Sequence, residues 1–275
     1  MRLSGWHFSL LLVFLCASGI ANGDVLDAYE GFNYTPGSSI DGLNGGSGWS
    51  GAWVTPGGLD ATVVGNSLTS GALAISGGAL STAGFQPANQ GSSVATWIRS
   101  LSAPLGADGT TAYLSFLFQP DAGAGFYGGL NFGGVFVGLS GNQSFYGLEG
   151  PTNDISLSAV PAVQDQPVLL VLQADFMAGD DRLSLYINPV AGGPEPAVPD
   201  VVKTDLDVGA VDSITVNNYG GFTIDEIRIG DTFASVTPIA SVPEPRSGAL
   251  LGLMLAAFIV IAARRKSANT MRARA

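Results

Sequence analysis

Short runs of alternating apolar and polar residues follow one another through most of this 275-residue chain, with turn residues between them. Each run is rich in β-branched or aromatic residues and ends near Gly, Pro, Asn or Asp, which is typical of β-strands. No stretch of helical length between residues 24 and 238 shows the 3.6-residue period of an amphipathic helix. The runs cover residues 94–101, 111–118, 130–139, 168–175, 183–187, 211–216 and 221–229. The pattern predicts an all-β domain, an antiparallel sandwich of two sheets.

The segments between these runs differ in their turn chemistry. Glycine-rich intervals at residues 42–51 and 123–129 are expected to be loops. The runs 168–175 and 182–187 flank a short turn, so they are expected to form an antiparallel hairpin. The segment 191–208 contains three prolines and is expected either to pass over a sheet edge or to be a disordered loop.

The run at residues 223–229 (TIDEIRI) predicts a late central strand. In a regular strand Glu226 and Arg228 share one face, whereas Asp225 lies on the other. Glu226 and Arg228 could then form an ion pair, worth about 0–1 kcal/mol if exposed.

The composition excludes several kinds of chemistry. The only cysteine and the only histidine are Cys16 and His7, near the N-terminus. The remainder therefore lacks disulfides, Ser-His-Asp triads, cysteine nucleophiles and zinc sites built from His or Cys. From residue 24 to 245, all 22 acidic residues stand against four basic ones, a net charge of −18, which should repel nucleic acid. Such sparse basic residues also make a buried salt-bridge network unexpected. They are Arg99, Arg182, Lys203 and Arg228.

The N-terminus has the three parts of a secretory signal peptide. Arg2 supplies the charge, residues 8–20 are apolar, and small residues precede a cleavage site expected between Gly23 and Asp24. Leu15 occupies the position before Cys16, where lipid-modified signals require a small residue, so a lipoprotein is not expected. We assign residues 1–23 to a signal peptide.

The C-terminus has a second tripartite pattern. A rigid Pro-Glu-Pro motif precedes sixteen apolar residues, 248–263, and a basic cluster follows them. As a helix the apolar segment would span about 24 Å, slightly less than a hydrocarbon core of ~30 Å. The basic cluster is expected to stay cytoplasmic, so that everything before it is exported. The motif and cluster comprise Pro243, Glu244, Pro245, Arg264, Arg265 and Lys266.

This order of motifs resembles the PEP-CTERM sorting signal of Gram-negative bacteria. The resemblance implies that an exosortase-type membrane enzyme recognises residues 239–275 while a transmembrane helix holds the precursor in the membrane. The protein would then reach the outer envelope, the cell surface or the extracellular matrix. The alternative is a plain C-terminal membrane anchor.

Segments of residues 24–238 also resemble exported proteins with concanavalin A-like or laminin G-like domains. The resemblance implies a jelly-roll sandwich, in a family that includes lectins, adhesion modules, matrix proteins and glycoside hydrolases. Fold analogy cannot choose among these functions. The similar segments are residues 30–34, 43–53, 113–117, 181–189 and 224–230.

Exposed aromatic residues can stack on a sugar ring and so contact a ligand. Trp49 and Trp53 lie in a glycine-rich stretch and could stack on a sugar, but we expect them to cover the core. Trp97 lies in the middle of a predicted strand and is expected in the core. Aromatics in or near glycine-rich loops are better candidates for ligand contact. These are Phe126, Tyr127 and Tyr146.

Carboxylates are the remaining catalytic groups. Glycosidases place two of them about 5–5.5 Å or 6.5–9.5 Å apart. Asp225 and Glu226 would face opposite sides of a regular strand, and the Glu-x-Asp-x-x-Glu pattern of jelly-roll hydrolases is absent. Asp205 and Asp207 have suitable spacing but are expected on a solvated edge.

Calcium could instead bind oxygen ligands in loops. Possible contributors are Asp180, Asp181, Asn153 and Asp154.

Together these observations predict an exported, non-enzymatic protein with a structural or adhesive role, acting through weak contact with exopolysaccharide. One alternative is a calcium-dependent carbohydrate-binding module with a defined pocket. Another is a carboxylate glycoside hydrolase. No other cofactor is expected.

Overall fold

The computed structural model describes residues 26–57, 59–83, 94–141 and 144–240, apart from the side chain of Phe126. The proposed signal peptide and all of the proposed sorting segment after residue 240 lie outside these residues, as do the Gly23–Asp24 cleavage site, the Pro243–Pro245 motif and the basic cluster. The elements are β1 (Leu26–Glu30), β2 (Thr62–Val64), β3 (Ala79–Ser81), β4 (Ala95–Leu105), β5 (Thr111–Phe132), β6 (Val135–Leu139), β7 (Phe145–Glu149), β8 (Ile155–Pro161), β9 (Val168–Asp175), β10 (Asp181–Ile187), β11 (Val201–Leu206), β12 (Val211–Gly230) and α2 (Phe233–Val236). No described helix is long and apolar enough to cross a membrane.

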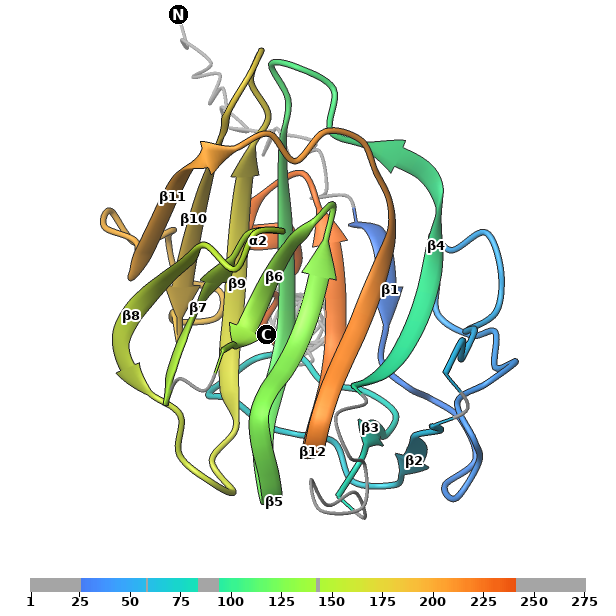
Figure 1. Ribbon diagram of the computed structural model, residues 1–275. Helices are drawn as coiled ribbons and strands as arrows, with labels where there is room; N and C mark the ends of the chain where they lie inside the picture. Colours follow the sequence, from blue (N-terminus) through green and yellow to red (C-terminus); the bar gives the residue numbers. More distant parts are fainter. Residues whose placement is uncertain (1–25, 58, 84–93, 142–143, 241–275) are drawn as a thin grey trace, which may run out of the picture.

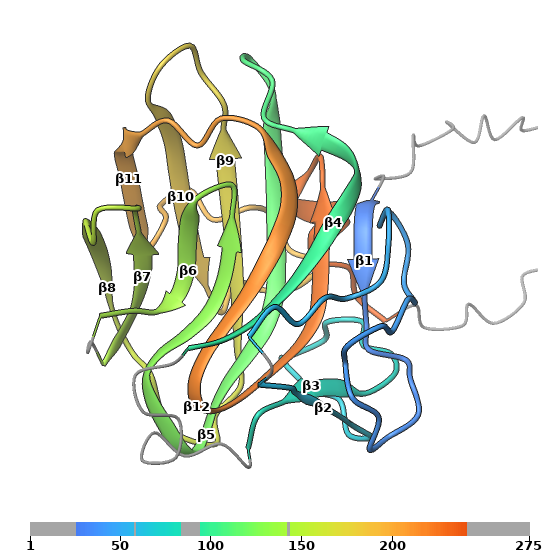
Figure 2. The same cartoon turned by 45° about the vertical axis from the view of Figure 1, so that its right-hand side comes forward.

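Two long strands, β5 and β12, run through both layers of an antiparallel sandwich (Figures 1 and 2). Their paired ends at 113–118 and 223–230 belong to a first layer, ordered β11-β10-β9-β5-β12, in which β12 also pairs with β1 and β3. Their other ends belong to a second layer, ordered β4-β12-β5-β6-β7-β8. The all-β, antiparallel two-sheet prediction is therefore confirmed.

The main core lies between the layers because every second residue of each strand points inward. On β5, Leu114, Phe116 and Phe118 enter this core, whereas Tyr113 and Leu117 join a smaller apolar cluster on the outer face of the first layer. The short helix α2 packs on that outer cluster. The two-residue period thus supplies two separate apolar surfaces from one strand.

Most strand predictions are confirmed, including the 168–175 hairpin, in which Arg182 pairs with Asp175. The loop expected at 123–129 is wrong, because these residues continue β5. Gly129 lies opposite Gly138 of β6, with φ angles of 153° and 150°. A Cβ at either position would lie 2.2–2.4 Å from a backbone oxygen. The glycines therefore allow close strand pairing rather than a turn.

The segment 191–208 is ordered, which contradicts one of the two courses predicted for it. Residues 201–206 form the edge strand β11, which pairs with β10. The preceding residues leave the sheet edge and return over the outer face of the first layer, where Glu195 meets Tyr113 and Tyr186. The disordered loop is therefore wrong; the loop covers a face of the sheet, and residues 201–206 themselves form its edge.

A buried ion pair overturns the expectation that such pairs would be absent. Arg99 of β4 is 0% exposed and Glu30 of β1 is 1% exposed, with Nη1 and Oε2 2.6 Å apart. The same Glu30 oxygen accepts hydrogen bonds from Tyr34 Oη and Trp53 Nε1. The carboxylate thus joins β1, β4 and the loop at 31–60. The small number of basic residues could not reveal this ion pair, because the number does not determine where each residue lies in the fold.

Candidate functional site

A cavity of about 540 Å³ opens on the outer face of the first layer. Its floor comes from β5 and β9, and its walls come from the loop before β11 and from the start of α2. We call it the Glu195 pocket. It is lined by Thr111, Tyr113, Gln173, Gly193, Pro194, Glu195, Asp231, Thr232, Phe233 and Ala234.

Glu195 is held at one wall by two tyrosines. Tyr113 Oη donates to its Oε2 at 2.8 Å, and Tyr186 Oη donates to its Oε1 at 2.6 Å. Burial first, and then Glu195 itself, raise the pKa of both phenols, so they remain protonated donors. The two bonds hold the carboxylate in one orientation at the edge of the cavity.

An aromatic cluster supports that arrangement. Phe233 of α2 packs edge-on against Tyr113 and Tyr186, with ring centroids 6.4 and 6.1 Å apart. The position of Phe233 follows from the preceding residue, since Thr232 caps α2 by accepting a hydrogen bond from Ser235 N. The cap therefore sets one wall of the pocket.

The polar floor is built from neighbouring strands. Thr111 Oγ1 and Gln173 Nε2 both donate to Asp175 Oδ1, at 2.8 and 3.2 Å. Gln173 Oε1 accepts from Tyr186 Oη at 3.2 Å. Thr111 and Asp175 are also cross-strand partners. The pocket thus combines aromatic surface with several convergent polar groups, as ligand sites commonly do.

None of the residues that form this pocket was predicted as a site. Tyr113 and Gln173 appeared only as strand positions, and Glu195 lay in a segment of undetermined course. The alternation in residues 201–206 could have revealed β11. It could not have shown that the preceding loop turns back onto the sheet, because that path depends on tertiary contacts.

The structure places the predicted aromatic residues mainly in the core. Trp53 and Trp97 are buried, as expected, and half-buried Trp49 donates from Nε1 to Tyr29 O. Tyr146 is 2% exposed and packs in the main core, and it also lines a smaller cavity of about 200 Å³. Tyr127 is half-buried and stacks on Phe136, with ring centroids 4.2 Å apart. The side chain of Phe126 lies outside the description.

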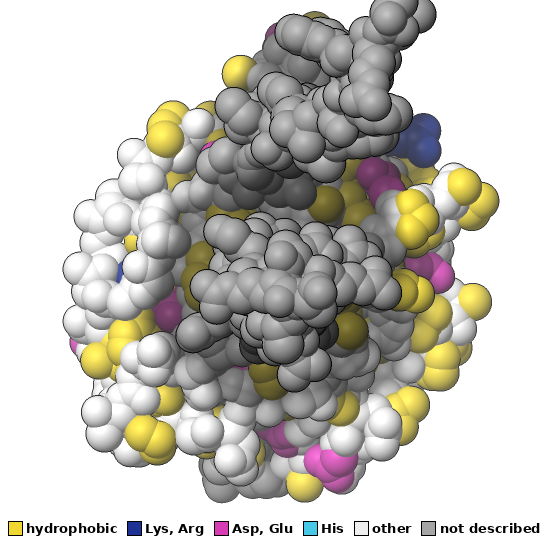
Figure 3. Space-filling model, turned by 180° about the vertical axis from the view of Figure 1, so that it is seen from behind, with side chains coloured by type: hydrophobic (Ala, Val, Ile, Leu, Met, Phe, Trp, Pro, Cys, Tyr) yellow, Lys and Arg dark blue, Asp and Glu magenta, His cyan; other side chains and the backbone are white. Residues whose placement is uncertain are grey.

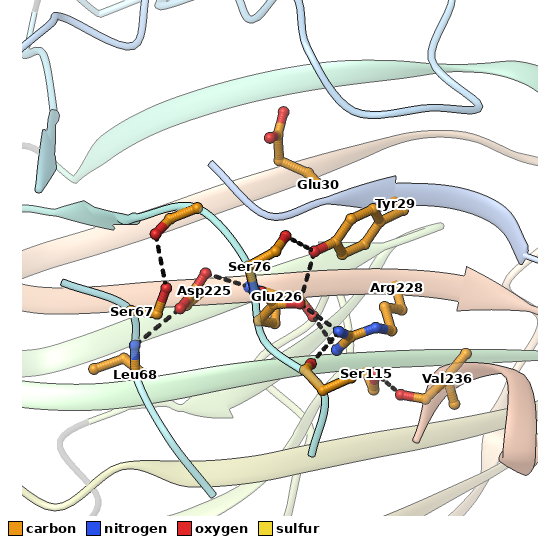
Figure 4. A network of polar contacts seen from close by, with 12 residues as sticks. Tyr29, Glu30, Ser67, Leu68, Ser76, Ser115, Asp225, Glu226, Arg228 and Val236 are labelled. Atoms are coloured by element: carbon orange, nitrogen blue, oxygen red, sulfur yellow. Dashed lines mark hydrogen bonds and ion pairs between the residues drawn. The ribbon is translucent and has the colours of Figure 1, made fainter. Parts of the chain in front are cut away.

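The prediction that Asp225 and Glu226 face opposite sides of a strand is wrong, because β12 is not regular there. Glu226 has a φ of 54°, and the pairing with β5 shifts between Asp225 and Arg228. Both carboxylates consequently engage the loop that precedes β3 (Figure 4). Asp225 Oδ2 accepts from Leu68 N at 2.9 Å, while Glu226 Oε1 accepts from Ser76 N.

Glu226 also accepts from Tyr29 Oη at 2.9 Å and forms an ion pair with Arg228. Asp225 and Glu226 are both 0% exposed. The Glu226–Arg228 pair is thus buried rather than exposed. We assign this network a structural role, attaching the loop to β12.

The remaining predicted carboxylates do not form a common site. Exposed Asp205 and Asp154 both form ion pairs with buried Lys203, and Asp207 lies exposed beyond β11, as expected for an edge. Buried Asp181 accepts from the backbone of Met177 and Val208. Asp180 is exposed, and Asn153 occupies a turn with a φ of 58°. Among the described residues, no three His, Cys, Asp or Glu side chains are grouped to hold a metal ion.

Comparisons with known proteins concern the fold. No protein-family model matches the chain, and no curated protein matches it. Domain 4 of the extracellular GH43 arabinanase AbnA from Geobacillus stearothermophilus, solved with arabinotriose, is similar at 15% identity and a TM-score of 0.48. That match covers 78% of this chain and 97% of that one.

Two further solved structures are similar at lower scores. An endo-1,3-β-glucanase from Streptomyces sioyaensis has 11% identity and a TM-score of 0.45, covering 78% of this chain and 98% of that one. The carbohydrate-binding module CBM66 from Bacillus subtilis has 11% identity and a TM-score of 0.30, covering 72% and 97%. At these values the similarities concern the fold alone.

Proposed function

We propose that this chain is an exported, non-enzymatic jelly-roll protein of the cell surface or extracellular matrix that binds polysaccharide through the Glu195 pocket. The observation that carries the proposal is the pocket itself. Its volume of about 540 Å³ falls within the ~300–1,000 Å³ typical of small-ligand sites. Its aromatic wall and oriented carboxylate offer apolar contact and hydrogen-bond acceptors to a sugar.

The carboxylate geometry supports binding rather than hydrolysis. Both oxygens of Glu195 accept from tyrosines, which favours a fixed acceptor over a proton-transferring acid. The adjacent acids Asp225 and Glu226 are buried in the structural network. A glycosidase would need two carboxyl groups facing one bound sugar at a catalytic separation. Calcium dependence remains the second candidate, because oxygen-rich loops suit that ion.

Changing Glu195 to glutamine should weaken polysaccharide binding at least tenfold, or about 1.4 kcal/mol. The amide removes the charge and replaces one acceptor by a donor that opposes a tyrosine hydroxyl. The full chain, purified in detergent, would be co-sedimented with matrix polysaccharide of the producing organism, with calcium and with chelator. Reducing ends would be assayed in the same tubes.

Asp205→Asn is the matched control, since it removes one carboxylate charge at an exposed edge and should leave binding unchanged. A Glu195→Gln variant that binds like the wild type would refute the pocket as the site. Binding lost only in chelator would favour the calcium-dependent module. New reducing ends would favour a hydrolase.

We also propose that residues 239–275 direct sorting by an exosortase-type enzyme. The order of the Pro-Glu-Pro motif, the apolar segment and the basic cluster supports this. Replacing Pro243, Glu244 and Pro245 together by alanine should leave an unprocessed precursor in the membrane fraction. The wild-type protein should lose the tail, as mass spectrometry of fractionated cells would show. Equal processing of both proteins would refute recognition of the motif and favour a plain anchor.

A further inference from the structure

We propose that the Glu195 pocket prefers saccharides that carry a protonated amine over neutral or anionic ones. This inference rests on the proposed function, since it names the ligand class of the same site. Its basis is the distribution of charge and of hydrogen-bond acceptors around the cavity.

Three of the four basic residues in the described part of the chain are unavailable to an anionic ligand. Arg99 is 0% exposed, and Lys203 and Arg228 are each 3% exposed. All three form ion pairs with carboxylates. Arg182 is the remaining basic residue there; it is exposed, pairs across the strands with Asp175, and its charge acts on Tyr186, so it offsets part of the negative charge beside the pocket. Acidic residues therefore dominate the accessible charge.

The pocket concentrates this negative charge. Glu195 and Asp231 both line it, and no Lys or Arg occurs among its lining residues. Asp175 adjoins the pocket, since it accepts hydrogen bonds from Thr111 Oγ1 and Gln173 Nε2. Asp231 also acts on Asp27, whose pKa is raised by burial and then by that neighbouring charge. In the view from behind, acidic side chains are scattered over this side of the molecule, whereas visible basic ones lie near its rim (Figure 3).

The hydrogen-bond directions agree with the charge. The tyrosine hydroxyls donate to Glu195, and one N–H of the Gln173 amide donates to Asp175. Glu195 and Asp231 present carboxylate lone pairs at the pocket, and these accept hydrogen bonds. A ligand that donates to these oxygens is therefore favoured. An ammonium group offers three donors and a positive charge, whereas a carboxylate ligand would meet like charges.

The test uses the full chain in detergent and three tetrasaccharides, which carry free amines (glucosamine), N-acetyl groups (N-acetylglucosamine) or carboxylates (galacturonic acid). Calorimetry at a pH where the amines are protonated should give at least tenfold tighter binding of the amine than of its N-acetyl counterpart, and no binding of the acid. Raising the salt from 50 to 300 mM should weaken amine binding selectively, because added ions screen the attraction.

Glu195→Gln and Asp231→Asn should each reduce the amine preference at least threefold, whereas Asp205→Asn should not. Circular dichroism would verify that all variants are folded. Equal or tighter binding of the N-acetyl ligand at the pocket would overturn this inference and leave the proposed function intact. Failure of all three tetrasaccharides would overturn the inference as well, while the matrix polysaccharide assay would decide the proposed function separately.

Discussion

Replacing Glu30 by glutamine should lower the free energy of unfolding by about 3–5 kcal/mol, the cost of leaving one partner of a buried ion pair uncompensated. Arg99 would remain 0% exposed with its main counter-charge removed. The carboxylate also accepts from Phe32 N, Tyr34 Oη and Trp53 Nε1. An amide cannot satisfy all of these donors, because its NH₂ group would oppose at least one of them.

Urea unfolding followed by tryptophan fluorescence would measure the loss. Asp205→Asn, which weakens an ion pair of an exposed aspartate, should cost no more than about 1 kcal/mol. The double variant Glu30→Met, Arg99→Met should recover much of the stability, since apolar residues can replace a buried ion pair. A loss below 1 kcal/mol for Glu30→Gln would contradict the importance assigned to the pair.

Raising the pH from 5 to 8 should destabilise the protein through Asp225. Burial, and then the charge of Glu226, raise the pKa of Asp225 to about 8 from its ordinary 3.8. Its contribution to stability is therefore fully present below about pH 4 and is lost as the pH rises through about 8, because the unfolded chain releases this proton earlier. Burial also raises the pKa of Glu226, which acts in the same direction.

The expected slope from Asp225 is at most about 1.4 kcal/mol per pH unit within that window. Urea unfolding at pH 5, 6, 7 and 8 would measure it, and Asp225→Asn should flatten the dependence because an amide does not titrate. The matched variant Asp205→Asn changes an exposed carboxylate and should keep the slope. An unchanged slope in Asp225→Asn would refute the assignment to this residue.

Where sequence reasoning succeeded, it relied on local periodicity. Alternation in residues 168–175 and 182–187 predicted the hairpin, and the central location of Trp97 in its strand predicted burial. These predictions depend on which side of a strand a residue occupies, and a two-residue period determines that without knowledge of the fold.

Where it failed, a distant contact changed the local geometry. The left-handed backbone of Glu226 directs two adjacent acids towards one loop, which a regular period excludes. The glycines at 123–129 have the composition of a turn, although Gly129 allows close pairing with β6. Glycine satisfies both requirements, so its presence alone does not distinguish them.

The sequence by itself determined the all-β class, most strands and the acidic balance, because these follow from residue type and short spacing. It also carries the tail motifs from which sorting is proposed. The tertiary structure alone decided where the scarce basic residues lie, how β12 bulges and which segment covers the outer face of the first layer. Glu195 meets Tyr113 across 82 residues of chain. Such a meeting depends on how the strands pair and how the loop returns, and no local pattern encodes either.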